Sequence, residues 1–285
     1  MAATATRGPQ ATTAAAEPPA RRPAKRQKSW FERLLRKRGP GVLAFAVFIG
    51  LWHLSILVFD PNPILFPGPV EVWDEWSKAA VDGTMWAAVT NSMYAMSIGM
   101  AISLVVGIPL GLIIGMSPTT DLITSPYLWG FFAMPRIALA PLMVLWLGFG
   151  AEIKIWLVVL SAIIPIILSC KDGVQTTDQS LVRAARSFGA GRVQLFTKVI
   201  APNTLPFIAS GVRNGISRGF VGLLIIELTV GTGGIGTEVI RSMRDLDTGR
   251  MFAFTATLIA LALFLVSLSR QLENYASRWR EEVAL

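Results

Sequence analysis

The sequence has one cysteine and one histidine among 285 residues, and only 15% of its residues are charged. Cys170 has no second cysteine with which to form an intrachain disulfide, and a lone thiol suggests no metal site. Its place in an apolar run predicts a small buried hydrophobic residue. His53 is the only histidine. The sequence therefore does not contain the combinations of histidine, cysteine and acidic residues that hydrolases and metalloenzymes usually need. We therefore predict no catalytic residue, no metal ligand and no cofactor in this chain.

The phosphate-binding pattern GxxxxGK followed by Ser or Thr occurs nowhere in the sequence. Residues 231–236, GTGGIG, match the dinucleotide pattern GxGxxG, but they follow a predicted membrane helix and have no strand–helix–strand unit around them. We interpret them as a flexible extracytoplasmic loop. Any ATP hydrolysis that this chain uses must therefore be supplied by a separate subunit.

The shortage of charge takes the form of long uncharged stretches, and the mean hydropathy is +0.54. Residues 83–120 and 251–269 contain no Asp, Glu, Lys, Arg or His. About 20 apolar residues suffice for a helix to cross a bilayer, whereas soluble domains carry about a quarter charged residues. The pattern predicts an all-α integral membrane protein with about six transmembrane helices. The apolar segments lie at 42–59, 87–116, 122–148 (interrupted by Pro135 and Pro141), 153–170, 207–228 and 251–269.

The net charge of +8 comes from the N-terminus, because residues 1–41 hold ten Lys and Arg against two Glu. The rest of the chain is neutral, so the charge does not indicate nucleic-acid binding. We predict a disordered basic tail with a short surface helix over 1–40, a transmembrane domain over 41–280 and a short tail over 281–285. The positive-inside rule places the basic tail and the basic loop 171–206 in the cytoplasm, and six crossings then put both termini there.

The polar stretch 171–206 predicts two short helices. Asp178 can cap the first, and the second covers 192–200, with apolar residues at helical spacing on one face. Such a hairpin either docks onto a partner or lies on lipid headgroups; both readings stay open on the residues alone, and we favour docking. The predicted break points are Gly189 or Gly191 between the helices and Pro202 and Pro206 after the second.

The same stretch resembles a family signature. Binding-protein-dependent importer permeases carry Glu-Ala-Ala, three residues, Gly, nine residues, then Ile-x-Leu-Pro; this chain has Ala184, Ala185, Gly189 and, at the matching spacing, Pro202. It departs at Arg183, where the family has Glu, and at Ala201, where it has Leu. Further resemblance extends over about 60–280 and is closest to the nitrate, sulfonate and taurine branch. It is carried by FPGPVEVW (66–73), VVGIPLGLIIG (105–115), PLMVLWLGFG (141–150) and GVRNGISRGFVGLLIIEL (211–228).

The resemblance implies a MetI-like type I ABC importer permease of the bacterial plasma membrane, in which the two short helices are coupling helices seated in a cytoplasmic ATPase. It further implies a homodimer of permeases, two ATPases that bind ATP and Mg²⁺, and an extracytoplasmic binding protein or lipoprotein that delivers a small organic or inorganic anion. The positions carried over to the ATPase contact are Arg183, Ala184, Ala185, Ser187, Phe188, Gly189, Ala190, Arg192, Val193, Phe196 and Pro202.

Three charges stand out at membrane depth: Arg136, Arg218 and Glu227. Such residues usually face a protein interior or a water-filled cavity. Either the arginines line a translocation path suited to anions, or they are structural and pair with Glu227 or with backbone carbonyls. Pyrimidine or flavin precursors and aromatic acids remain alternative substrates. An ion-coupled secondary transporter is the rival class, but the sequence shows no internal repeat.

Overall fold

The computed structural model describes residues 30–276, and the chain divides into two compact units, residues 1–51 and 52–285. In the first unit, the described residues belong to α1 (Trp30–Phe59), which continues through Pro40 and ends in the second unit. The predicted surface helix and the first apolar segment are therefore one helix. The predictions for residues 1–29 and for the tail 281–285 lie outside the described residues.

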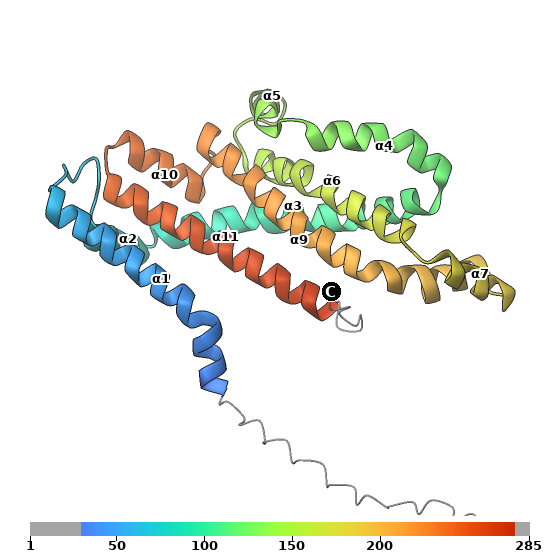
Figure 1. Cartoon of the computed structure of the whole chain (residues 1–285). Coiled ribbons are helices and arrows are strands. Elements are labelled where there is room, and N and C mark those ends of the chain that lie inside the picture. The colour runs from blue at the N-terminus through green and yellow to red at the C-terminus, as the bar shows by residue number, and fades with distance from the viewer. Residues whose placement is uncertain (1–29, 277–285) are drawn as a thin grey trace, which may run out of the picture. The chain divides into compact units, whose positions relative to one another are not determined.

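The second unit is built from helices joined by short connections, and residues 30–276 contain no strand (Figure 1). This confirms the predicted all-α class. The helices after α1 are α2 (Pro69–Val81), α3 (Thr84–Met116), α4 (Pro118–Ala133), the 3₁₀ turn η1 (Arg136–Leu139), α5 (Ala140–Leu147), α6 (Ala151–Gln175), α7 (Gln179–Ser187), α8 (Arg192–Leu195), the π turn η2 (Phe196–Ile200), α9 (Ala201–Val230), α10 (Ile235–Arg244) and α11 (Thr248–Ala276).

Four helical segments are long and apolar enough to cross a membrane, and the pair α4 and η1–α5 makes a fifth if it counts as one broken span. The four are α3, α6, the continuous run containing α9, and α11. The apolar part of α1, Leu43–Phe59, is shorter. These elements correspond one to one with the six apolar segments that the sequence predicts.

The broken span bends by 87° between α4 and η1–α5. Met134 is extended, with φ −63° and ψ 131°, as expected for a residue before proline. Pro135 therefore interrupts the segment as predicted. Pro141 does not, because it lies in the first turn of α5, where its missing N–H would have had no helical partner.

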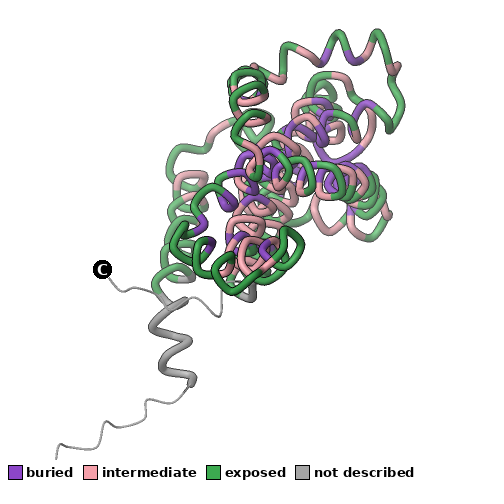
Figure 2. The backbone as a smooth tube through the Cα atoms, turned by 90° about the vertical axis from the view of Figure 1, so that its right-hand side faces the viewer, coloured by how far each residue is buried: buried purple, intermediate pink, exposed green. Residues whose placement is uncertain are grey.

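The core of the second unit is the contact of α6 with α3 on one side and α9 on the other. Figure 2 shows buried residues gathered where the helices pack together. Glycines allow this approach: a Cβ added at Gly111 of α3 would lie 2.6 Å from the Cβ of Cys170, and one at Gly222 of α9 would lie 2.3 Å from Ser161 Oγ. Small residues let helix backbones come close, which is how helices associate without a hydrophobic driving force in lipid. Cys170 is fully buried there, so the structure confirms its packing role.

The prediction that Pro202 and Pro206 end the second short helix is wrong. The helix runs on from α8 through the π turn η2 into α9, with Pro202 in the first turn of α9 and Pro206 inside it. In the π turn, the N–H of Ala201 donates to the carbonyl of Phe196, five residues earlier. An α-helix would bond to the carbonyl four residues earlier, so the turn holds one extra residue, as π turns within helices do. One helical rod therefore extends from Arg192 to Val230.

Candidate functional site

Two short helices, α7 and α8, form an elbow (residues 178–200) at one end of the bundle, opposite α10 (Figure 1). Asp178 caps α7, because its carboxylate accepts a 2.7 Å hydrogen bond from the N–H of Ser180; this bond lowers the pKa of Asp178. Gly189 makes the turn with φ +80°, and Gly191, at φ −71°, is the N-cap of α8. The structure thus confirms the cap and places the left-handed residue at Gly189.

The elbow has an inner and an outer apolar edge. Val182 and Leu195 are buried, whereas Phe188 and Val193 are 92% and 76% exposed. In the second helix of the elbow, Phe196 is half-buried, and the π turn begins at this residue. Of the positions expected to contact an ATPase, Ala185, Ala190, Phe196 and Pro202 are half-buried, and the remaining positions are exposed.

Two residues anchor the bundle just before the elbow. Lys171 of α6, with a side chain only 8% exposed, forms a 3.0 Å ion pair with Asp121 of α4 and a 3.0 Å hydrogen bond to Ser125. Gln175 donates to the same carboxylate at 2.7 Å. The last turns of α6 are therefore tied to the first turn of α4, so the helix that leads into the elbow starts from a fixed point.

Arg136 and Arg218 come together in one pocket with a volume of about 700 Å³. Its walls are the break between α4 and η1, Ser161 and Pro165 of α6, and the Asn214–Ile225 stretch of α9. The guanidinium of Arg218 lies over the ring of Phe132, 4.9 Å from its centroid. Neither arginine forms an ion pair among the described residues, so the expected pairing with Glu227 is not observed.

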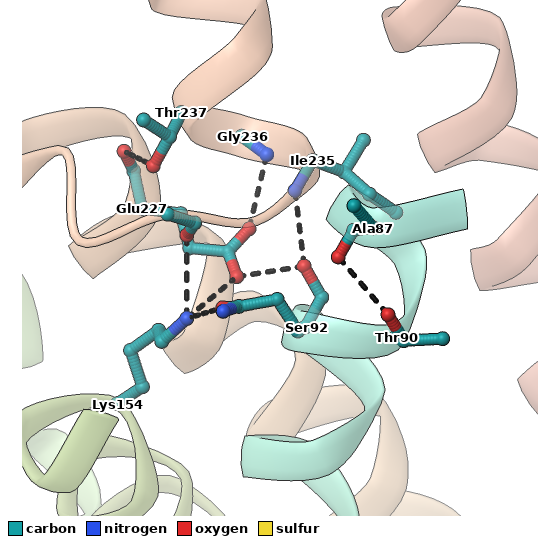
Figure 3. A network of polar contacts seen from close by, with 10 residues as sticks. Ala87, Thr90, Ser92, Lys154, Glu227, Ile235, Gly236 and Thr237 are labelled. Atoms are coloured by element: carbon teal, nitrogen blue, oxygen red, sulfur yellow. Dashed lines mark hydrogen bonds and ion pairs between the residues drawn. The ribbon is translucent and has the colours of Figure 1, made fainter. Parts of the chain in front are cut away.

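Glu227 lies instead in a buried polar network with Lys154 (Figure 3). Both side chains are at most 1% exposed, and the ammonium nitrogen of Lys154 is 3.8 Å from Glu227 Oε1. Ser92 donates to the carboxylate at 2.7 Å and the N–H of Gly236 at 3.0 Å. Lys154 in turn donates to Asn91 and, at 3.3 Å, to the carbonyl of Gly233. The network joins α3, α6 and α9 to the segment that leads into α10.

Glycines of the 231–236 segment let the backbone approach the buried carboxylate of this network closely. Gly234 has φ +100°, and a Cβ there would lie 2.1 Å from Glu227 Oε1. The N–H of Ile235 donates to Ser92 Oγ at 3.0 Å. The segment therefore packs against a buried carboxylate, and the expectation of a flexible loop is wrong. Among residues 30–276, no cluster of His, Cys, Asp or Glu is placed to hold a metal ion.

Residues 107–281 match the family described as the binding-protein-dependent transport system inner membrane component. The chain belongs to this family. It is thus the permease subunit of an ABC importer in the bacterial plasma membrane, a transport subunit rather than an enzyme, whose ATPase is a separate protein. The family also implies a binding-protein partner.

The permease is 31% identical over 264 residues to the taurine transport system permease protein TauC of Escherichia coli, covering 90% of this chain and 96% of TauC. It is 26% identical over 265 residues to SsuC of Bacillus subtilis, named for aliphatic sulfonates transport, covering 93% of each. A solved inward-facing structure of the MetNI methionine ABC transporter shares the fold, with a TM-score of 0.59, 18% identity, and coverage of 67% of this chain and 97% of that one. The predicted MetI-like architecture is confirmed.

Sequence reasoning missed Lys154 as a membrane-buried charge of the permease. It lies in the first turn of α6 beside Glu152, so it resembled a residue at the membrane boundary. The glycine-rich match at 231–236 was a second unused signal, because glycines with positive φ allow close approach to a neighbouring group. Arg213 of α9 and Glu273 of α11 form an ion pair at 3.0 Å. No pattern in the sequence predicts that these two residues meet.

Proposed function

We propose that the permease translocates a small anion that an extracytoplasmic binding protein or lipoprotein delivers. Two permease copies would form the pathway as a homodimer, and two cytoplasmic ATPases, which bind ATP and Mg²⁺, would drive it. The basic loop around the elbow and both termini would lie in the cytoplasm, as the positive-inside rule predicts. The elbow would be the ATPase contact, with the same eleven positions between Arg183 and Pro202 that the sequence analysis named.

The observation that carries this proposal is the exposed apolar tip of the elbow. Phe188 is 92% exposed, it directly precedes the left-handed Gly189, and it lies beyond the apolar spans. An aromatic side chain held outside the bundle by a capped helix and a fixed turn suits a partner's pocket, because buried aromatics dominate interface energetics. The departure at Arg183 leaves this geometry unchanged.

Movement of the elbow would reach the pathway through one rigid element. The helical rod Arg192–Val230 begins inside the elbow, and its middle, around Arg218, forms a wall of the arginine-lined pocket. A displacement of α8 by the ATPases would therefore move that wall directly. Rigid helix bundles that rock around a fixed site are the usual means of alternating access.

An anionic substrate fits the charge of this pocket. Among residues 30–276, the only charged residues that line it are Arg136 and Arg218, and TauC and SsuC are named for taurine and aliphatic sulfonates. Glu227 lies outside the pocket lining, so we assign it to the network with Lys154 rather than to the path. Aromatic acids and pyrimidine or flavin precursors are the alternative substrates. A thermal-shift ligand screen of the cognate binding protein would separate them.

Co-purification with the cognate ATPase tests the proposal. We expect wild-type permease to bring the ATPase down stoichiometrically, and Phe188→Ser to reduce the recovered ATPase by about tenfold or more. Val81→Ser, at an 89% exposed apolar residue of α2 far from the elbow, is the matched control and should retain the ATPase. Transport by the permease alone, driven by an ion gradient without any ATPase, would instead support a secondary transporter.

A further inference from the structure

The arginine-lined pocket has an excess of positive charge that nothing in the described part of the chain balances. No carboxylate lines it, and the nearby Glu227 is already paired with Lys154. Arg136 Nη2 is buried without a hydrogen-bond partner. A charged group at membrane depth is costly unless it is paired. An anion bound in the pocket would balance this charge.

A second buried donor faces the same space. Ser161 lines the pocket, is fully buried, and its Oγ has no hydrogen-bond partner among the described residues. The close approach of Gly222 holds this hydroxyl in place, since a Cβ at Gly222 would lie 2.3 Å from it. A buried hydroxyl without a partner costs free energy. Two orphaned donors at one pocket, Arg136 Nη2 and Ser161 Oγ, are the pattern expected of an oxyanion site.

The position of Arg218 is set by an aromatic ring. Its guanidinium lies 4.9 Å from the centroid of Phe132, within the range of a cation–π contact, and Phe132 in turn packs edge-on against Trp129 at 5.8 Å. The stacking holds the cation without neutralising it. The fork of N–H donors on Arg218 consequently remains available to bind an anion in the pocket.

Apart from Asn214 and Ser217, the rest of the lining is apolar, and the pocket is larger than a bare anion needs. Hydrophobic side chains contribute from the α4–η1 break and from α9: Phe132, Met134, Ile137, Val221 and Ile225. An inorganic oxyanion in a volume of about 700 Å³ would leave these side chains against water. Small-molecule sites typically combine such apolar walls with a few placed polar groups that fix orientation.

We propose that this pocket binds an organic anion by its oxyanion head group, with Arg136, Arg218 and Ser161 as head-group ligands and the apolar wall around the tail. This site rests on the proposed import function, and it narrows the range of expected substrates. Amphipathic sulfonates or carboxylates should be preferred over inorganic sulfate or nitrate. In a homodimer each protomer would contribute one such pocket. Ser161 is then a specificity-determining residue.

Direct binding to the permease–ATPase complex in nanodiscs, without binding protein, tests this site. The probes are methanesulfonate, propanesulfonate, butanesulfonate and sodium sulfate, and the readout is calorimetric Kd. We expect Kd to fall about fourfold for each added methylene and to be weakest for sulfate. Arg136→Gln and Arg218→Gln should each raise the butanesulfonate Kd roughly tenfold or more, and Ser161→Ala roughly tenfold.

Arg241→Gln, on the exposed side of α10, is the matched control and should leave Kd unchanged. If an arginine variant fails to fold, Ser161→Ala and the tail-length series still decide the question. Equal affinity for sulfate and butanesulfonate, or a Kd that Ser161→Ala does not change, would overturn the site. The co-purification test of the elbow does not depend on this pocket. If the permease binds the ATPase but the pocket binds no anion, the anion site is refuted and the import function stands. If wild-type permease does not bind the ATPase, the import mechanism itself is refuted.

Discussion

Lys154 and Glu227 oppose each other at 3.8 Å in almost complete burial, at the end of the bundle that carries α10. A pair like this is not by itself a source of stability, because removing two charges from water costs about as much as their attraction returns. Its value lies in its neighbours, because Ser92, Asn91 and the carbonyl of Gly233 in the segment before α10 each form a hydrogen bond with one of the two charged groups. The pair thus fixes the relative positions of four segments, and its disruption should be costly.

Removing one partner should therefore destabilise the permease strongly. Glu227→Gln leaves Lys154 buried without a counter-charge, so we expect a loss of about 3 kcal/mol or more in the free energy of unfolding. The measurement is reversible unfolding in mixed micelles. The double variant Lys154→Met, Glu227→Gln should recover at least half of that loss, and strictly additive effects would show that the two residues are not coupled.

The close contact at Gly234 gives a second stability test. Gly234→Ala introduces a Cβ into space held by the Glu227 carboxylate, 2.1 Å away, at a backbone φ of +100°. We expect a loss of about 2 kcal/mol or more, from strain and from displacement of the carboxylate. Gly130→Ala is the control, because its Cβ would meet nothing within 4 Å inside α4 and alanine favours helices. Similar melting temperatures for the two variants would contradict the packing.

The turn of the elbow should respond to a substitution at one glycine and not at the other. Gly189 has φ +80°, where alanine costs about 1 kcal/mol, whereas Gly191 has φ −71° and open space around it. We expect Gly189→Ala to lower the substrate-stimulated ATPase activity of the reconstituted importer severalfold and Gly191→Ala to leave it near wild type. Equal activities would mean that the turn geometry does not matter for coupling.

The cap of α7 should depend on pH. Its hydrogen bond to Ser180 lowers the pKa of Asp178 from an ordinary value of 3.8, so the cap is fully formed above that value and is lost as the pH falls through the lower folded-state pKa. We expect amide hydrogen exchange in α7, corrected for intrinsic rates, to quicken below about pH 4. Asp178→Asn keeps a good cap and should remove this pH dependence.

The sequence predicted the apolar segments well, because a bilayer requires long uncharged helices and leaves few alternatives. It also predicted the elbow, since Asp178 and Gly189 carry local signals of a cap and a turn. Long-range partners were less accessible. Nothing near Lys154 in the sequence indicates that it faces Glu227, and the meeting of Arg136 with Arg218 depends on the 87° bend of the broken span. Pro202 and Pro206 were expected to end the second short helix, but Pro202 directly follows the π turn at the start of α9 and Pro206 lies inside α9; proline favours a break or a kink in a helix, and tertiary packing decides which of the two occurs.

Cross-linking from the elbow tests the central claim most directly. The chain has a single cysteine, Cys170, which is fully buried, so Phe188→Cys would introduce one exposed thiol without further changes. In membranes that contain the assembled importer, we predict that this thiol cross-links to the ATPase with a yield that changes on ATP binding. Labelling of the thiol by an impermeant reagent applied from outside the cell, with no ATPase cross-link, would contradict the account.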